Sequence, residues 1–148
     1  MAVLIISDYP KKKLFNQIIL LKKAIQKLNR EVDLLTFSKG HLTFCNGQNS
    51  RNNSLKLFEE VLNEKRYEAI AISLQSENFE KLFSGFKFFK ILRKKQFETR
   101  VFLFGSSKYF HSTEAINKSN FFHYPRAGVA KVSIAFKEDL LKYLMKSA

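Results

Sequence analysis

The chain has 148 residues, enough for one domain with a sizeable buried core. Hydrophobic residues make up 45% of it, which excludes a disordered chain, and 16 Phe with no Trp predict a core rich in phenylalanine. The net charge of +13 attracts polyanions, but dispersed lysines fit a generic charged surface equally well.

Short apolar runs alternate with longer helical patterns along the whole chain. A continuous apolar run closed by polar residues is typical of a strand buried on both faces, and apolar residues every three or four positions indicate an amphipathic helix. In chain order we predict a strand at 2–7, a helix at 10–28, a strand at 31–37, a loop at 40–53, a helix beginning at 54, a central strand at 67–74, a helix at 77–95, a strand at 101–104, a weaker helix at 109–117, a short strand at 120–124 and a closing helix at 136–146. The loop leaves room for a small hairpin around Asn46-Gly47.

This alternation predicts the fold class α/β. Connections of helix length require parallel strands and right-handed crossovers. We therefore expect one domain over residues 1–148, a doubly wound five-stranded parallel sheet with helices on both faces. Ligands bind such sheets at the carboxyl ends of the strands. Those ends are at residues 7–8, 37–38, 73–75, 105–107 and 124–125.

The strand ends resemble those of a receiver domain of the response-regulator family. A receiver's first strand ends in paired acidic residues before a proline, and here Ser7-Asp8 precede Tyr9-Pro10. Its third strand ends on the phosphoacceptor aspartate, where this chain has Ser73. Its fourth ends near a Ser or Thr, here Ser106, and its fifth in Lys-Pro, here Tyr124-Pro125. The resemblance spans nearly the whole chain and rests on topology and strand ends.

By this resemblance, a degenerate phosphorylation pocket consists of Ser7, Asp8, Ser73, Ser106 and Tyr124. Aspartyl phosphorylation needs a carboxylate nucleophile, Mg²⁺ held by several acidic oxygens, and a lysine. Serines replace the second acid and the nucleophile, and a tyrosine replaces the lysine. We expect no phosphorylation, no catalytic residue, no cofactor and no metal. Asp8 fits equally well as a cap of the following helix.

Other chemistry has weaker support in the sequence. The 8–10 loop lacks the glycines of a nucleotide-binding loop, and its aspartate repels phosphate. Residues 105–108 fit a small-anion site or a plain polar turn. The three histidines lack the close pairing of zinc ligands, and Cys45 has no local base, which favours an inert thiol.

A basic cluster ends the helix expected at 77–95 and provides candidate contacts to a polyanion. Its members are Lys87, Lys90, Arg93, Lys94 and Lys95, with Arg100 beyond them. The helix dipole alone favours cations there, and no nucleic-acid-binding motif accompanies them. Nucleic-acid association is therefore an alternative function.

An aromatic group of residues surrounds the last expected strand. Tyr109, Phe110, Phe122 and Tyr124 are the interface candidates, because the corresponding face of receivers is their usual docking and dimer surface. Exposed aromatic side chains mark interfaces. Burial of alternate members, as in any strand, is the competing interpretation.

Cys45, as the sole cysteine, excludes an intramolecular disulfide and suits a reducing compartment. The apolar run at 2–6 precedes the lysines, the wrong order for a signal peptide, and no run approaches the length of about 20 residues that a membrane span needs. We expect a cytoplasmic protein without membrane contact. It fits a free-standing adaptor or the N-terminal module of a longer protein.

The leading interpretation is a non-phosphorylatable pseudo-receiver, an atypical receiver that takes part in two-component signalling by protein–protein interaction. It would not be an enzyme, and its partners would be other proteins or a second copy of itself. The alternatives are a basic nucleic-acid-associated protein on the same fold and, third, a small-ligand-binding protein or cofactor-independent enzyme.

Overall fold

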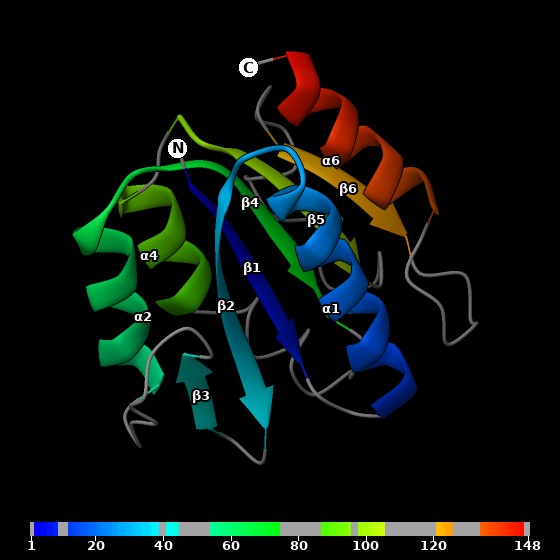
Figure 1. Ribbon diagram of the computed structural model, residues 1–148. Helices are drawn as coiled ribbons and strands as arrows, with labels where there is room; N and C mark the ends of the chain where they lie inside the picture. Colours follow the sequence, from blue (N-terminus) through cyan, green and yellow to red (C-terminus); the bar gives the residue numbers. More distant parts are fainter. Residues whose placement is uncertain are drawn as a thin grey trace.

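A computed structural model describes residues 2–8, 12–38, 41–44, 54–74, 87–95, 98–105, 121–125 and 134–146. Its elements are β1 (Ala2–Asp8), α1 (Lys12–Gln26), β2 (Glu31–Ser38), β3 (His41–Phe44), α2 (Ser54–Glu64), β4 (Tyr67–Ser73), α4 (Lys87–Lys95), β5 (Arg100–Gly105), β6 (Phe121–Pro125) and α6 (Ile134–Lys146) (Figure 1). Within these ranges, no helix has the length and apolar character needed to cross a membrane.

The strands form one six-stranded sheet in the order β3-β2-β1-β4-β5-β6. β1 runs parallel to β2 and β4, and the pairs β4–β5 and β5–β6 are also parallel. β3 alone runs antiparallel, beside β2. The α/β class and its parallel sheet are therefore confirmed, whereas the predicted number of five strands is wrong, because β3 adds a sixth.

β3 lies inside the segment that the sequence predicts as a loop. It pairs with β2 from Leu35↔Phe44 to Ser38↔His41, so residues 39–40 separate the two strands of this hairpin. The alternative hairpin around Asn46-Gly47 lies outside the described residues. The sequence does not predict β3, because its polar and apolar residues alternate over only four positions. They also stand next to a long stretch rich in asparagine, which favours loops.

The other strands and most helices agree with the sequence prediction to within a few residues. α4 corresponds to the carboxyl-terminal half of the helix predicted at 77–95, of which residues 77–86 lie outside the described ranges. The helix predicted at 109–117 also lies outside them. β6 and α6 match the predicted strand at 120–124 and the closing helix.

Apolar side chains form two clusters on opposite faces of the sheet, because successive strand residues point to opposite sides. Leu4 and Ile6 of β1 pack with α2 and α4, whereas Val3 and Ile5 pack with α1 and α6. Figure 1 shows the two helix pairs on either side of the sheet. The described core is mainly Leu, Ile and Val, with Phe58, Phe104 and Phe136 as its largest fully buried side chains.

α1 ends in a tight turn that leads directly into β2. The main-chain nitrogens of Leu28 and Asn29 each donate a hydrogen bond of 3.0 Å, to Ile25 and Gln26 respectively. Asn29 has φ 60°, a left-handed conformation that asparagine tolerates better than most residues. The turn places Arg30 at the amino-terminal edge of the sheet.

Candidate functional site

The carboxyl ends of β1 and β4 bring Ser7, Asp8 and Ser73 together. Ser7 lies directly opposite Ser73 on the neighbouring strand, and all three residues are buried. Ser7 Oγ donates a 2.9 Å hydrogen bond to the main-chain oxygen of Asp8. Ser73 is fully buried, and its Oγ has no hydrogen-bond partner among the described residues. Three of the residues predicted to form one pocket therefore lie together.

Tyr124, the fourth described member of the predicted pocket, does not join that group. It lies next to the last residue of β6, two strands away from β4, and its hydroxyl donates a 2.6 Å hydrogen bond to Asp139 of α6. Burial raises the pKa of Tyr124, and the hydrogen bond and negative charge of Asp139 raise it further. Ser106 lies outside the described residues. In the parts of the chain that the structure describes, no three potential ligands cluster in a way that would hold a metal ion.

A groove of about 530 Å³ lies between strands β5 and β6 and helix α6. We call it the β6–α6 groove, and its lining combines aromatic rings with charged groups: Arg100, Phe102, Phe122, Tyr124, Asp139, Lys142, Tyr143 and Lys146. The groove contains two of the four interface candidates, Phe122 and Tyr124. The other two, Tyr109 and Phe110, lie outside the described residues.

The aromatic rings of the groove pack against each other. Phe102 stacks on Phe122, with ring centroids 5.3 Å apart and 22° between the planes, and lies 5.8 Å from the ring of Tyr143. Tyr124 meets Phe136 of the core edge to face, at 5.8 Å and 73°. Phe122 and Tyr124 are both half-buried. These two side chains therefore pack inward and also line the groove.

Arg100 lies over this aromatic floor. Its guanidinium carbon is 5.5 Å from the ring centre of Phe122 and 5.0 Å from that of Tyr143, which is a cation–π geometry. Lys142 and Lys146 of α6 are exposed and four residues apart, so they lie on the same side of the helix. We call these three residues the cationic rim. None of them forms an ion pair with another described residue.

The structure separates Arg100 from the basic cluster to which the sequence assigns it. α4 packs on the face of the sheet covered by α2, whereas Arg100 contacts rings on the α6 side. Lys90, Lys94 and Lys95 are exposed on α4. Lys87 and Arg93 lie on the same helix. The exposed lysines of α4 and the cationic rim are therefore two separate basic surfaces.

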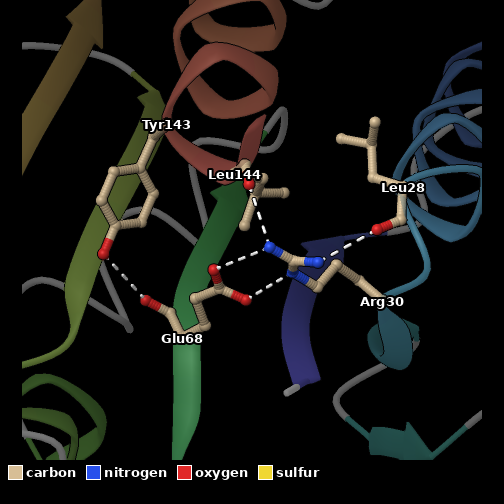
Figure 2. A network of polar contacts seen from close by, with 5 residues as sticks. All are labelled: Leu28, Arg30, Glu68, Tyr143 and Leu144. Atoms are coloured by element: carbon tan, nitrogen blue, oxygen red, sulfur yellow. Dashed lines mark hydrogen bonds and ion pairs between the residues drawn. The ribbon is translucent and has the colours of Figure 1, made fainter. Parts of the chain in front are cut away.

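A buried ion pair holds α6 in place from the amino-terminal edge of the sheet. Arg30 donates to both carboxylate oxygens of Glu68, from Nε at 2.7 Å and from Nη2 at 3.3 Å. The same guanidinium donates to the main-chain oxygens of Leu28 and Leu144, both at 3.0 Å (Figure 2). Leu28 lies in the turn that follows α1, and Leu144 lies in the last turn of α6. Arg30 therefore caps two helices at once, with a charge that suits both.

Glu68 reaches this position through a bulge in β4. Ala2 pairs with Tyr67 but Val3 pairs with Ala69, so Glu68 is the extra residue. Its side chain is 4% exposed and faces α6, and the hydroxyl of Tyr143 lies 3.5 Å from its main-chain oxygen. Tyr143 belongs to this network and to the groove wall, so the two features are mechanically connected.

A second polar network lies on the other face of the sheet. The hydroxyl of Tyr67 donates to Asp33 Oδ2 at 2.7 Å, and Lys65 lies 2.8 Å from the same oxygen and 2.6 Å from Glu31. Burial raises the pKa of Tyr67, and the hydrogen bond and negative charge of Asp33 raise it further. Burial lowers the pKa of Lys65, but hydrogen bonds to Asp33 and Glu31 and their charges outweigh it, so the pKa is raised.

Neither protein-family models nor the curated proteins compared with this sequence give a match. The functional argument therefore depends on the geometry of the strand ends and of the β6–α6 groove.

Proposed function

We propose that this chain is a non-phosphorylatable, receiver-like domain that acts as a protein-interaction module, with the β6–α6 groove as its docking site. It would contribute to signalling by binding a partner, without chemical turnover. The observation that carries the proposal is the groove itself, which combines aromatic side chains with three cations that form no ion pair with another described residue.

The arrangement of the strands supports a receiver-like architecture. With β3 set aside, the parallel strands follow the order β2-β1-β4-β5-β6, which is the doubly wound order 2-1-3-4-5. Helices pack against both of its faces. The antiparallel β3 is an addition to this pattern at the β2 edge.

The strand ends support a loss of phosphoryl chemistry. A phosphorylated receiver holds Mg²⁺ with several acidic oxygens, because this hard cation binds oxygen ligands in a near-octahedral shell. Among the residues that the structure describes at the ends of β1 and β4, one carboxylate, Asp8, lies beside two serines. A serine hydroxyl is a poor nucleophile without an adjacent base.

The groove supports docking because of what its side chains can contribute to binding. Aromatic residues and arginine are the residue types that most often dominate binding energy at protein interfaces. Here the rings are held by stacking and by the core, so they lose little conformational freedom when a partner binds.

The test is a pull-down from native cell lysate after nuclease treatment, with wild type, Phe122→Ala and Leu20→Ala. Phe122→Ala removes part of the groove floor at unchanged charge. Leu20→Ala truncates an exposed leucine of α1 and is the apolar control outside the groove. We expect a discrete protein that wild type and Leu20→Ala retain and that Phe122→Ala loses. Retention by Phe122→Ala with unchanged thermal stability would contradict docking in the groove.

Nucleic-acid association is the second candidate, favoured by the exposed lysines on α4. It predicts that proteins leave the pull-down on nuclease digestion and that affinity for polyanions falls steeply with salt. Lys90→Glu/Lys94→Glu would then abolish the binding that Phe122→Ala leaves intact.

A further inference from the structure

We infer that the β6–α6 groove binds an extended acidic peptide segment that carries carboxylates at alternate positions next to a bulky apolar side chain. This inference rests on the proposed docking function and specifies the chemistry of the partner. It follows from the charge, the geometry and the ring packing of the groove.

The charges of the groove are complementary to an anion. Three cations, Arg100, Lys142 and Lys146, face one carboxylate, Asp139, which already accepts the hydroxyl hydrogen of Tyr124. The net charge of +13 adds a long-range attraction for acidic partners and accelerates their encounter with the protein.

The side chain of Arg100 is held in an orientation that suits the binding of a carboxylate. Its guanidinium lies against two rings, those of Phe122 and Tyr143, which restrict its orientation before any ligand arrives. A planar guanidinium keeps its in-plane N–H donors available when a ring covers its face, and these donors match the two oxygens of a carboxylate.

The two lysines of α6 set the spacing of the acids. Four residues of helix separate Lys142 from Lys146, a rise of roughly 6 Å along the axis. Two residues of extended chain span roughly 6.6 Å, and their side chains point to the same side. A strand-like peptide with acids at alternate positions therefore presents both carboxylates to both lysines, and the residue between them points the opposite way.

The apolar anchor would occupy the aromatic part of the groove. Phe102, Phe122 and Tyr143 lie next to one another beneath the cationic rim, and the groove volume of about 530 Å³ accommodates a large side chain. Edge contacts with these rings are the ordinary way in which aromatic side chains pack.

Ring packing argues against single-stranded nucleic acid as the occupant. Base stacking requires open ring faces. Phe102 and Phe122 cover each other, Arg100 lies over Phe122 and Tyr143, and Tyr124 packs edge to face on Phe136. Asp139 would also repel a continuous phosphate backbone, whereas a peptide avoids it by placing a neutral residue there.

Fluorescence anisotropy with synthetic probes tests the inference. The probe is a fluorescein-labelled peptide with glutamates at alternate positions followed by phenylalanine. One control has the same composition with the glutamates adjacent, a second has glutamine for glutamate, and a third is an oligouridylate of equal charge. We expect the alternating peptide to bind about tenfold more tightly than either peptide control, which corresponds to a few ion pairs at a partly exposed site.

Charge reversal on matched surfaces locates the binding. Lys142→Glu/Lys146→Glu changes the cationic rim, and Lys90→Glu/Lys94→Glu makes the same change in net charge on α4, on the other face of the sheet. The first should weaken peptide binding about tenfold or more, and the second should leave it within about twofold. Arg100→Lys should also weaken it, because lysine keeps the charge but loses the planar fork.

Three outcomes would overturn the inference. Equal binding of the alternating and adjacent peptides removes the spacing argument. Tighter binding of oligouridylate, abolished by Lys142→Glu/Lys146→Glu, makes nucleic acid the occupant. Capture of a cellular protein that depends on Phe122, with no affinity for any acidic peptide, leaves the docking function standing and refutes the acidic partner.

Discussion

Arg30→Met is expected to destabilise the fold by about 3–5 kcal/mol, the usual cost of removing one member of a buried ion pair. The side chains of Arg30 and Glu68 are 11% and 4% exposed, so water replaces the lost guanidinium poorly. The variant also uncaps Leu28 and Leu144 at two helix ends. Because a domain is stable by only about 5–15 kcal/mol, this is a large fraction of the total.

A double-mutant cycle isolates the contribution of the pair. Arg30→Met, Glu68→Met and the double variant would be compared by urea unfolding, monitored by circular dichroism. We expect the double variant to cost less than the sum of the single variants by about 2–3 kcal/mol, because it leaves no charge buried without its counterpart. Native-state hydrogen exchange should show faster opening of the last turn of α6 in Arg30→Met.

Additive single variants, or a loss below about 1 kcal/mol for Arg30→Met, would refute this reasoning, since exposed pairs have such small effects. Glu31→Gln is a comparison at a more exposed pair, with side chains 32% and 67% exposed for Lys65 and Glu31, and it keeps the contact between Lys65 and the buried Asp33. Arg30→Met should also weaken groove binding, because the network holds Tyr143 and the end of α6 in place.

Two further predictions concern Tyr67 and the strand ends. Because the pKa of Tyr67 in the folded state is raised above its ordinary value of 10.0, the unfolded chain loses that proton first, so stability is complete below pH 10 and falls as pH rises above it. Above pH 10 the slope approaches about 1.4 kcal/mol per pH unit for this one group, so the stability of Tyr67→Phe should fall less steeply by that amount in urea titrations between pH 10 and about 12. An identical slope would contradict the burial of the hydroxyl. Ser7→Asp/Ser73→Asp should lower the melting temperature in chelator, because it buries two more carboxylates beside Asp8, and Mg²⁺ should restore it while leaving wild type unchanged. A variant that Mg²⁺ does not rescue would argue against receiver-like geometry at these strand ends.

Much of the sheet is predictable from sequence because β1, β4 and β5 are continuous apolar runs buried on both faces, a pattern that few other structures produce. β3 is not predictable in this way, because four residues give too few periods to distinguish a strand from a loop. Its existence depends on pairing with β2, which is a tertiary interaction.

The groove was only half predictable. Phe122 and Tyr124 stand in one short aromatic segment, which made them candidates, but Arg100 and Tyr143 come from β5 and α6 and meet only in the folded chain. Nearness in sequence groups Arg100 with the basic residues of α4, but in the folded chain they lie on opposite faces of the sheet. A clue for Tyr143 exists in the sequence, because a tyrosine on an amphipathic helix combines an apolar ring with a polar group and suits a groove wall.

Glu68 and Arg30 illustrate a different limit. From the sequence, Glu68 is a polar residue near the start of a predicted strand. No residue pattern predicts the bulge that turns its side chain toward α6. Arg30 reads as one more surface cation in a chain with 26 basic residues. Nothing local shows that its guanidinium meets residue 68 and residue 144.

The position of β1 has a consequence for the chain as it leaves the ribosome. β1 is made before the other described strands, yet it lies inside the sheet, with seven buried residues between β2 and β4. β2 and β3 emerge soon after it, and β2 pairs with one edge of β1. At a synthesis rate of about 5–20 residues per second, the strand at 67–73 that completes the other side arrives seconds later. During that interval an open apolar strand edge can pair with other nascent chains, a hazard that the finished fold no longer displays.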